Sequence, residues 1–229
     1  MEKGNNFLAI AIIVASVIVG GSFIYGNSIG GNSDGTAQLA VNVEDDVTDE
    51  IIVERDISDD DVVLGDPSAP VVFVEFGDYQ CPFCKQLSIT EKRIREEYVA
   101  TGKLKMVFRD FPLDAIHPNA RPASEAAECA RDHGKYWQYH DVLFERQDEL
   151  PTMDYVSVAR GLGIDEAEFK ACFEGGKYKD EVERDYQDGI KLGVSGTPTS
   201  FINGKRIPGA LPYEAFRDAI EDALRTASN

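Results

Sequence analysis

The pattern of hydrophobic and polar residues beyond residue 62 predicts an alternation of strands and helices. Residues 71–76 are β-branched or aromatic with one charged exception, as in a buried strand, and Gly77 follows them. Residues 82–101 carry apolar side chains at helical spacing, and a glycine comes directly after them. Residues 104–109 have an apolar side chain at every second position, which predicts a second strand. Because a long helix separates the two strands, we expect a right-handed crossover and parallel pairing.

The sheet is expected to resume only near the carboxy terminus. Residues 199–202 and 205–207 flank Asn203-Gly204, a dipeptide that favours the tight turn of a β-hairpin. An amphipathic helix ends the chain. The intervening stretch, 118–192, predicts only helices, one of which begins at a capping-box-like Asp165 and Glu168. The expected order is therefore βαβ, a helical insertion, and then ββα.

Two cysteines, Cys81 and Cys84, stand where the first strand gives way to its helix. Pro82 suits the first helical turn, because a proline there gives up only an amide that would lack a partner. Cys81 is then expected at the amino-terminal tip, where free amides and the helix dipole lower the pKa of a thiol. Cys84 is expected one turn inside, more buried and less ionised. Because a thiolate both attacks disulfides and leaves readily, this asymmetry suits disulfide exchange.

Half of a zinc site is the alternative interpretation of this cysteine pair. A zinc ribbon needs a second close pair of cysteine or histidine residues. The other two cysteines, Cys129 and Cys172, are far apart in the sequence, and His117, His133 and His140 are interpreted as helix-cap, surface and core residues. Redox chemistry is therefore favoured, and neither a metal nor another cofactor is expected.

Four segments of the chain carry a family resemblance. They are Gly65-Asp66-Pro67-Ser68-Ala69-Pro70, Cys81-Pro82-Phe83-Cys84, Gly134-Lys135-Tyr136-Trp137 and Gly193-Val194-Ser195-Gly196-Thr197-Pro198-Thr199. Over residues 62–227 the chain resembles the DsbA-type thioredoxin-fold oxidoreductases, in particular the single-domain members that are membrane-anchored or secreted. The resemblance implies an α/β thioredoxin fold with a helical insertion, at about 118–192, between the second and third core strands.

The resemblance also implies how a substrate is bound and attacked. Cys81 is the expected nucleophile, which forms a mixed disulfide with the substrate, and Cys84 is the expected resolving thiol. Pro198 is expected to be cis and to present the backbone of Thr197 to an extended substrate. An ordinary trans proline that enters a strand is the alternative.

Phe83 departs from the strongly oxidising members of the family, which often have a histidine at this position. A phenylalanine offers neither charge nor a hydrogen bond to the neighbouring thiolate. The departure predicts a disulfide less oxidising than that of DsbA. With Pro82, Phe83 is expected to form part of the substrate-binding surface.

Glu75 lies six residues before Cys81, where the thioredoxin family carries a buried acid behind its second cysteine. A buried carboxyl has a raised pKa and can accept the proton that Cys84 must lose. A strand-edge glutamate in solvent is the alternative.

The amino-terminal segment predicts export. Residues 7–25 are 19 consecutive uncharged, mostly apolar positions, enough for a helix that spans a bilayer. Lys3 precedes them and acids follow, so the positive-inside rule puts residues 1–6 in the cytoplasm and the domain at 62–229 outside. A cleaved signal peptide is the alternative, although the apolar run exceeds the usual signal core. We favour an uncleaved anchor.

Residues 26–61 are expected to form a flexible acidic linker. Residues 34–61 hold 11 acids and one arginine, which gives −10 of the whole chain's formal charge of −18. We interpret this charge as a solvated spacer, with recruitment of a basic partner as the alternative. Nucleic acid is not expected as a partner, because its phosphates would be repelled.

Cys129 and Cys172 lie inside the expected helical insertion. The chain has four cysteines, an even number, and its domain is expected outside the cytoplasm, where disulfides persist. Cys129 and Cys172 could therefore form a structural disulfide, as in some relatives of the DsbA type. Two buried unpaired cysteines are the alternative.

The favoured function is disulfide formation in reduced or unfolded exported proteins, with a membrane redox partner that reoxidises Cys81 and Cys84. A membrane-tethered reductase or isomerase is the alternative within the same chemistry. Isomerases of this fold usually add a dimerisation domain, and the segment before residue 62 is short and polar for one. A noncatalytic binding or chaperone module is the third possibility.

Overall fold

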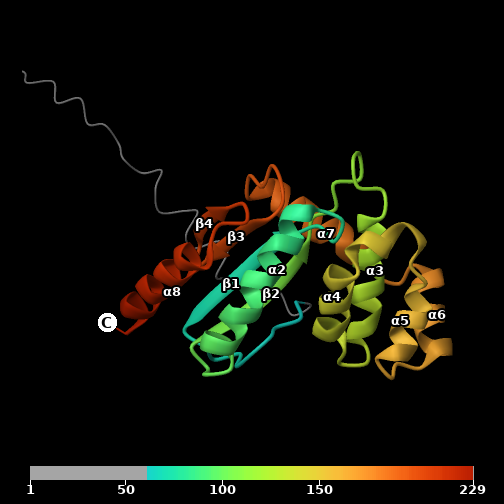
Figure 1. Ribbon diagram of the computed structural model, residues 1–229, viewed down its shortest axis with the longest axis horizontal. Helices are drawn as coiled ribbons and strands as arrows, with labels where there is room; N and C mark the ends of the chain where they lie inside the picture. Colours follow the sequence, from blue (N-terminus) through green and yellow to red (C-terminus); the bar gives the residue numbers. More distant parts are fainter. Residues whose placement is uncertain (1–60, 229) are drawn as a thin grey trace, which may run out of the picture. The chain divides into compact units, whose positions relative to one another are not determined.

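A four-stranded mixed sheet lies at the centre of residues 61–228, the part of the chain that the computed structural model describes (Figure 1). Strand β1 pairs parallel with β2 and antiparallel with β3, which pairs antiparallel with β4. The parallel pairing of β1 and β2 is the pairing predicted from the sequence. The strands, in the spatial order β2-β1-β3-β4, are Leu104–Asp110, Val71–Gly77, Thr199–Ile202 and Lys205–Pro208.

The predicted segments at 1–6, 7–25 and nearly all of 26–61 lie outside the described residues. Within residues 61–228, no helix combines the length and the apolar character that a membrane crossing requires.

The helix that follows β1 is divided, where the sequence predicted one helix over 82–101. Helix α2 spans Pro82–Ile94, and a wider π-helical turn, η1, continues it over Arg95–Val99. In this turn the amide of Ala100 donates to the carbonyl of Arg95, five residues back. Its Tyr98 is buried and donates to Glu221 of helix α8, Tyr213–Ala227, over 2.8 Å. The turn thus joins the first helix to the last.

The insertion between β2 and β3 is helical, as predicted. Asp165 caps one of its helices by accepting hydrogen bonds from two amides of the first turn. The additional helix Tyr155–Gly161 was not predicted, because seven residues give only a short apolar pattern. The insertion contains α3 (Ala120–Arg131), α4 (Tyr136–Glu145), a 3-10 turn η2 (Gln147–Thr152), α5 (Tyr155–Gly161), α6 (Glu166–Gly175) and α7 (Lys179–Lys191).

The alternation of side chains along β1 divides the core into two clusters. Val71 and Phe73 pack with α2, α8 and most of the insertion, whereas Val72, Val74 and Phe76 pack on the other face, with side chains that include Tyr186 of α7. In Figure 1, α2 and α8 cover one face of the sheet and α3–α6 gather beside β2. Glu75 lies on the same face of β1 as Val71 and Phe73, because side chains alternate along a strand, so its side chain points toward α2.

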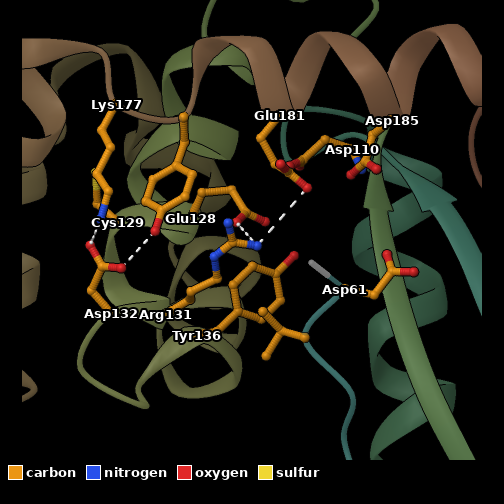
Figure 2. A network of polar contacts seen from close by, with 12 residues as sticks. Asp61, Asp110, Glu128, Cys129, Arg131, Asp132, Tyr136, Lys177, Glu181 and Asp185 are labelled. Carbon is orange, nitrogen blue, oxygen red and sulfur yellow. Dashed lines mark hydrogen bonds and ion pairs between the residues drawn. The ribbon is translucent and has the colours of Figure 1, made fainter. Parts of the chain in front are cut away.

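A disulfide joins Cys129 of α3 to Cys172 of α6, the pairing implied by the family resemblance. It closes a loop with a sequence separation of 43 residues inside the insertion. Near it, Asp132 accepts hydrogen bonds from Lys177 and Tyr178, so the disulfide and these polar contacts tie the same two regions together (Figure 2).

Buried acidic groups join the insertion to the sheet (Figure 2). Arg131 of α3 lies 3.1 Å from Glu128 and 3.9 Å from Glu181 of α7, and Asp185 accepts the amide of Asp110 at the end of β2. Burial raises the pKa of Asp110 to about 7 and raises the pKa of Glu128 and Asp185 well above their usual range. The carboxyl groups of this junction are therefore harder to ionise than exposed ones.

Candidate active site

The amino-terminal tip of α2 holds the two cysteines predicted to carry the chemistry. Cys81 is the residue before the first helical turn, and Pro82 occupies that turn. Cys81 is 4% exposed and Cys84 is fully buried, one turn further on. Both are free thiols. The local placement is the one predicted from the sequence.

The environment of Cys81 favours its thiolate. A hydrogen bond from the Cys84 thiol is the main reason why the pKa of Cys81 falls to about 6. Burial opposes this effect, whereas Thr197 and the amides of Cys84 and Phe83 reinforce it. The helix-tip amides therefore contribute as expected, but the second cysteine contributes more. At pH 7 the thiolate form of Cys81 is the larger population.

Cys84 is held in the opposite state. Burial raises the pKa of Cys84 well above its usual range, and its hydrogen bond to Cys81 and the negative charge of Glu75 act in the same direction. The amide of Asp78 donates to Cys84 Sγ over 3.4 Å and offsets part of this effect. Cys84 therefore remains a protonated thiol and must lose its proton before it can attack.

The loop before β3 brings Thr197 and Pro198 to Cys81. The Thr197–Pro198 peptide bond is cis, and Cys81 Sγ lies 3.4 Å from the Thr197 carbonyl oxygen. Pro82 and Phe83 are exposed beside this contact, with 61% of Phe83 accessible. A thiolate, an extended backbone and an exposed aromatic ring thus come from two segments more than 100 residues apart.

Glu75 is buried behind the cysteines, 2% exposed, and is not the solvent-exposed strand-edge residue of the alternative interpretation. Burial raises the pKa of Glu75 well above its usual range, and the neighbouring Glu91 raises it further. Since the charge of Glu75 raises the pKa of Cys84, the carboxyl lies within electrostatic reach of the thiol whose proton must leave.

Asp78 is a site residue that the sequence analysis missed. It is fully buried and accepts the amides of Gln80, Cys81 and Leu113 at 2.7, 3.1 and 2.8 Å. His117 Nδ1 lies 2.8 Å from the same carboxylate, so His117 binds the catalytic turn and is not simply a helix cap. An aspartate four residues before a helix start is a typical turn-forming signal and could have indicated this role.

Gln147 of η2 was also missed. Its side-chain amide donates to the carbonyls of Tyr79 and Cys81 over 2.8 and 2.9 Å, from a position 66 residues beyond Cys81. The insertion therefore holds the turn that carries Cys81. No local pattern in the sequence indicates such a contact.

Comparison with known proteins identifies the family of this fold and site. A family model described as thioredoxin matches residues 58–222. The chain belongs to the thioredoxin family. Solved structures of the same fold agree with this assignment. This chain is 28% identical to oxidised BdbD from Bacillus subtilis, with a TM-score of 0.64, and the match covers 72% of this chain and 94% of that one. For Wolbachia pipientis alpha-DsbA1, the identity is 24%, the coverage 74% and 94%, and the TM-score 0.65. These similarities confirm the DsbA-type resemblance.

The curated relatives of this chain include larger proteins. The chain is 37% identical over 169 residues to Na(+)/H(+) antiporter NhaA 3 of Salinispora tropica, which covers 74% of this chain but 26% of that protein. It therefore spans about a quarter of the length of the antiporters it matches. The chain is also 26% identical to the probable disulfide bond formation protein D of Bacillus anthracis, over 98% of this chain and 100% of that protein.

Proposed function

We propose that this protein is an extracytoplasmic thiol-disulfide oxidoreductase that forms disulfide bonds in exported proteins. The observation that carries the proposal is the opposed ionisation of the two cysteines: the pKa of Cys81 is lowered to about 6, and that of buried Cys84 is raised. A stable Cys81 thiolate is a good leaving group, which favours the reduced pair and makes the disulfide oxidising.

The reaction transfers one disulfide to a substrate. A substrate thiolate attacks Cys81 of the Cys81–Cys84 disulfide, forms a mixed disulfide and releases Cys84, which takes up a proton. A second substrate thiolate attacks the substrate sulfur of the mixed disulfide and releases the Cys81 thiolate. The substrate has lost two electrons and gained a disulfide, and the enzyme holds both electrons as a thiolate and a thiol.

The proposed substrate surface surrounds Cys81. An extended segment of an unfolded protein would hydrogen-bond to the backbone of Thr197 beside cis Pro198 and would contact Pro82 and Phe83. The 4% exposure of Cys81 requires close approach of the substrate backbone. Glu75 would exchange the proton of Cys84.

We further propose that a membrane redox partner reoxidises the cysteine pair. Reoxidation requires an acceptor of two electrons, which the described residues do not include. The similarity to disulfide bond formation protein D and to BdbD supports this assignment. Residues 7–25 are proposed as a single membrane anchor, with the domain at 62–229 outside the membrane and 26–61 as the linker.

A pair of assays on the full-length protein tests the function. The oxidised protein should restore activity to reduced, unfolded ribonuclease in stoichiometric amounts, while turning over slowly in insulin reduction by dithiothreitol. Rapid insulin reduction without ribonuclease oxidation would favour the reductase alternative. No reaction in either assay would contradict both.

A further inference from the structure

A second buried carboxyl lies beside Glu75. Glu91 is 1% exposed and is located on the buried face of α2, seven residues or two helical turns beyond Cys84. Glu75 points toward this face from β1, and Glu91 lies close enough to raise the pKa of Glu75. The two buried carboxyl groups therefore act on each other, and a negative charge on Glu91 favours the protonated form of Glu75.

Arg95 provides the counter-charge for this pair. Its guanidinium lies 3.6 Å from Glu91, one helical turn away, and 2.7 Å from Asp141 of α4. Only 15% of the Arg95 side chain is exposed. His140 hydrogen-bonds to Asp141 over 3.0 Å, so α4 reaches the carboxyl pair through these groups.

Few other charged groups act on Glu75 within residues 61–228. Cys81 and Cys84 approach it from the start of α2. On the neighbouring strands, Glu75 is paired with Phe108 and Ser200, which carry no charge. After burial itself, the charge of Glu91 is the largest influence that raises the pKa of Glu75, and Arg95 acts in the opposite direction.

We propose that Glu91 and Arg95 are positioning residues that control the availability of Glu75 as the acceptor of the Cys84 proton. This inference rests on the proposed function. In the resolving step, Cys84 gives its proton to the Glu75 carboxylate, the Cys84 thiolate attacks Cys81 of the mixed disulfide, and the partner sulfur leaves as a thiolate. The negative charge of Glu91 favours the protonated form of Glu75, and the positive charge of Arg95 favours its carboxylate.

The sign of the effect distinguishes the two residues. The Glu91→Gln variant removes a negative charge, lowers the pKa of Glu75 and makes its carboxylate available at lower pH. The Arg95→Gln variant removes a positive charge and moves the availability of the carboxylate to higher pH. If the pKa of Glu75 changes by one unit, the fraction of Glu75 that is carboxylate changes about tenfold at a pH below that pKa. A carboxylate of lower pKa is also a weaker base, which offsets about half of this gain on a logarithmic scale. The expected change in the rate of the resolving step is therefore about threefold.

The experiment measures the resolving step directly. Reduced full-length protein is mixed with saturating oxidised glutathione, quenched with acid at intervals, and the decay of the glutathione adduct is followed by mass spectrometry across pH. The Glu91→Gln profile should move to lower pH and the Arg95→Gln profile to higher pH. In the Glu75→Gln variant, the rate of the resolving step should no longer show the rise with pH that reflects ionisation of Glu75, here called the pH-dependent limb. Glu96→Gln, an equal charge change at an exposed site of η1, should match the wild type.

The outcomes separate this inference from the proposed function. A general packing defect would slow both variants without opposite displacement, so displacement of both in one direction, or of neither, overturns the role of Glu91 and Arg95. Retention of the limb in Glu75→Gln also overturns it, while the cysteine chemistry would still stand. Failure of wild-type protein to form an adduct would instead contradict the proposed function.

Discussion

The Cys81→Ser variant is expected to have no detectable disulfide exchange. A serine hydroxyl does not ionise near neutral pH and cannot form the mixed disulfide, so the first step is lost. The measurement is the rate at which the oxidised or reduced protein exchanges with ribonuclease or insulin. The Cys84→Ser variant, which differs by the same single atom, is the matched control.

Cys84→Ser should retain the first step and lose the second. Its Cys81 still attacks a disulfide, but no resolving thiol follows, so covalent complexes with substrates accumulate and are visible on non-reducing gels. Full activity of Cys81→Ser, or complexes that form through Cys84 when Cys81 is absent, would reverse the assignment of nucleophile and resolving thiol.

Loss of the Cys129–Cys172 disulfide is expected to reduce the free energy of unfolding by about 4 kcal/mol. In the chain-entropy model, a cross-link with a separation of 43 residues lowers the conformational entropy of the unfolded chain by an amount that corresponds to this free energy. The test is urea unfolding of the Cys129→Ala/Cys172→Ala variant. Substitution of Cys81 and Cys84 by serine in both proteins removes any contribution of the active-site pair.

Chemical reduction provides a second measurement of the same quantity. In the background that lacks Cys81 and Cys84, dithiothreitol should destabilise the parent protein to the level of the double alanine variant. A difference below about 1 kcal/mol between the parent and the variant would show that the disulfide contributes little to stability.

Local patterns in the sequence predicted the framework of the fold. The β-branched run of β1 and the Asn203-Gly204 turn each depend on neighbouring residues only. Both residues of this turn have positive φ, 43° and 81°, as the favoured hairpin turn requires. The position of Cys81 at a helix tip likewise follows from a strand, a proline and a helical pattern in adjacent segments.

Contacts between distant segments explain what the sequence did not predict. Gln147 reaches Cys81 from the insertion, and the residue pair Glu75 and Glu91 forms only when β1 packs on α2. Because Glu91 and Arg95 are charged, the helical pattern of the sequence would place them on the exposed face of the helix. The seven-residue interval between Cys84 and Glu91 was the available signal, because it puts both on one helix face.

The ionisation of Cys81 is the central claim, and the pH dependence of its alkylation tests it most directly. Reduced full-length protein is treated with iodoacetamide across pH, and modification of Cys81 is quantified by peptide mass spectrometry. The rate should follow a single ionisation with a pKa of about 6. A midpoint above about 8, the range of an unperturbed thiol, would contradict the proposed mechanism.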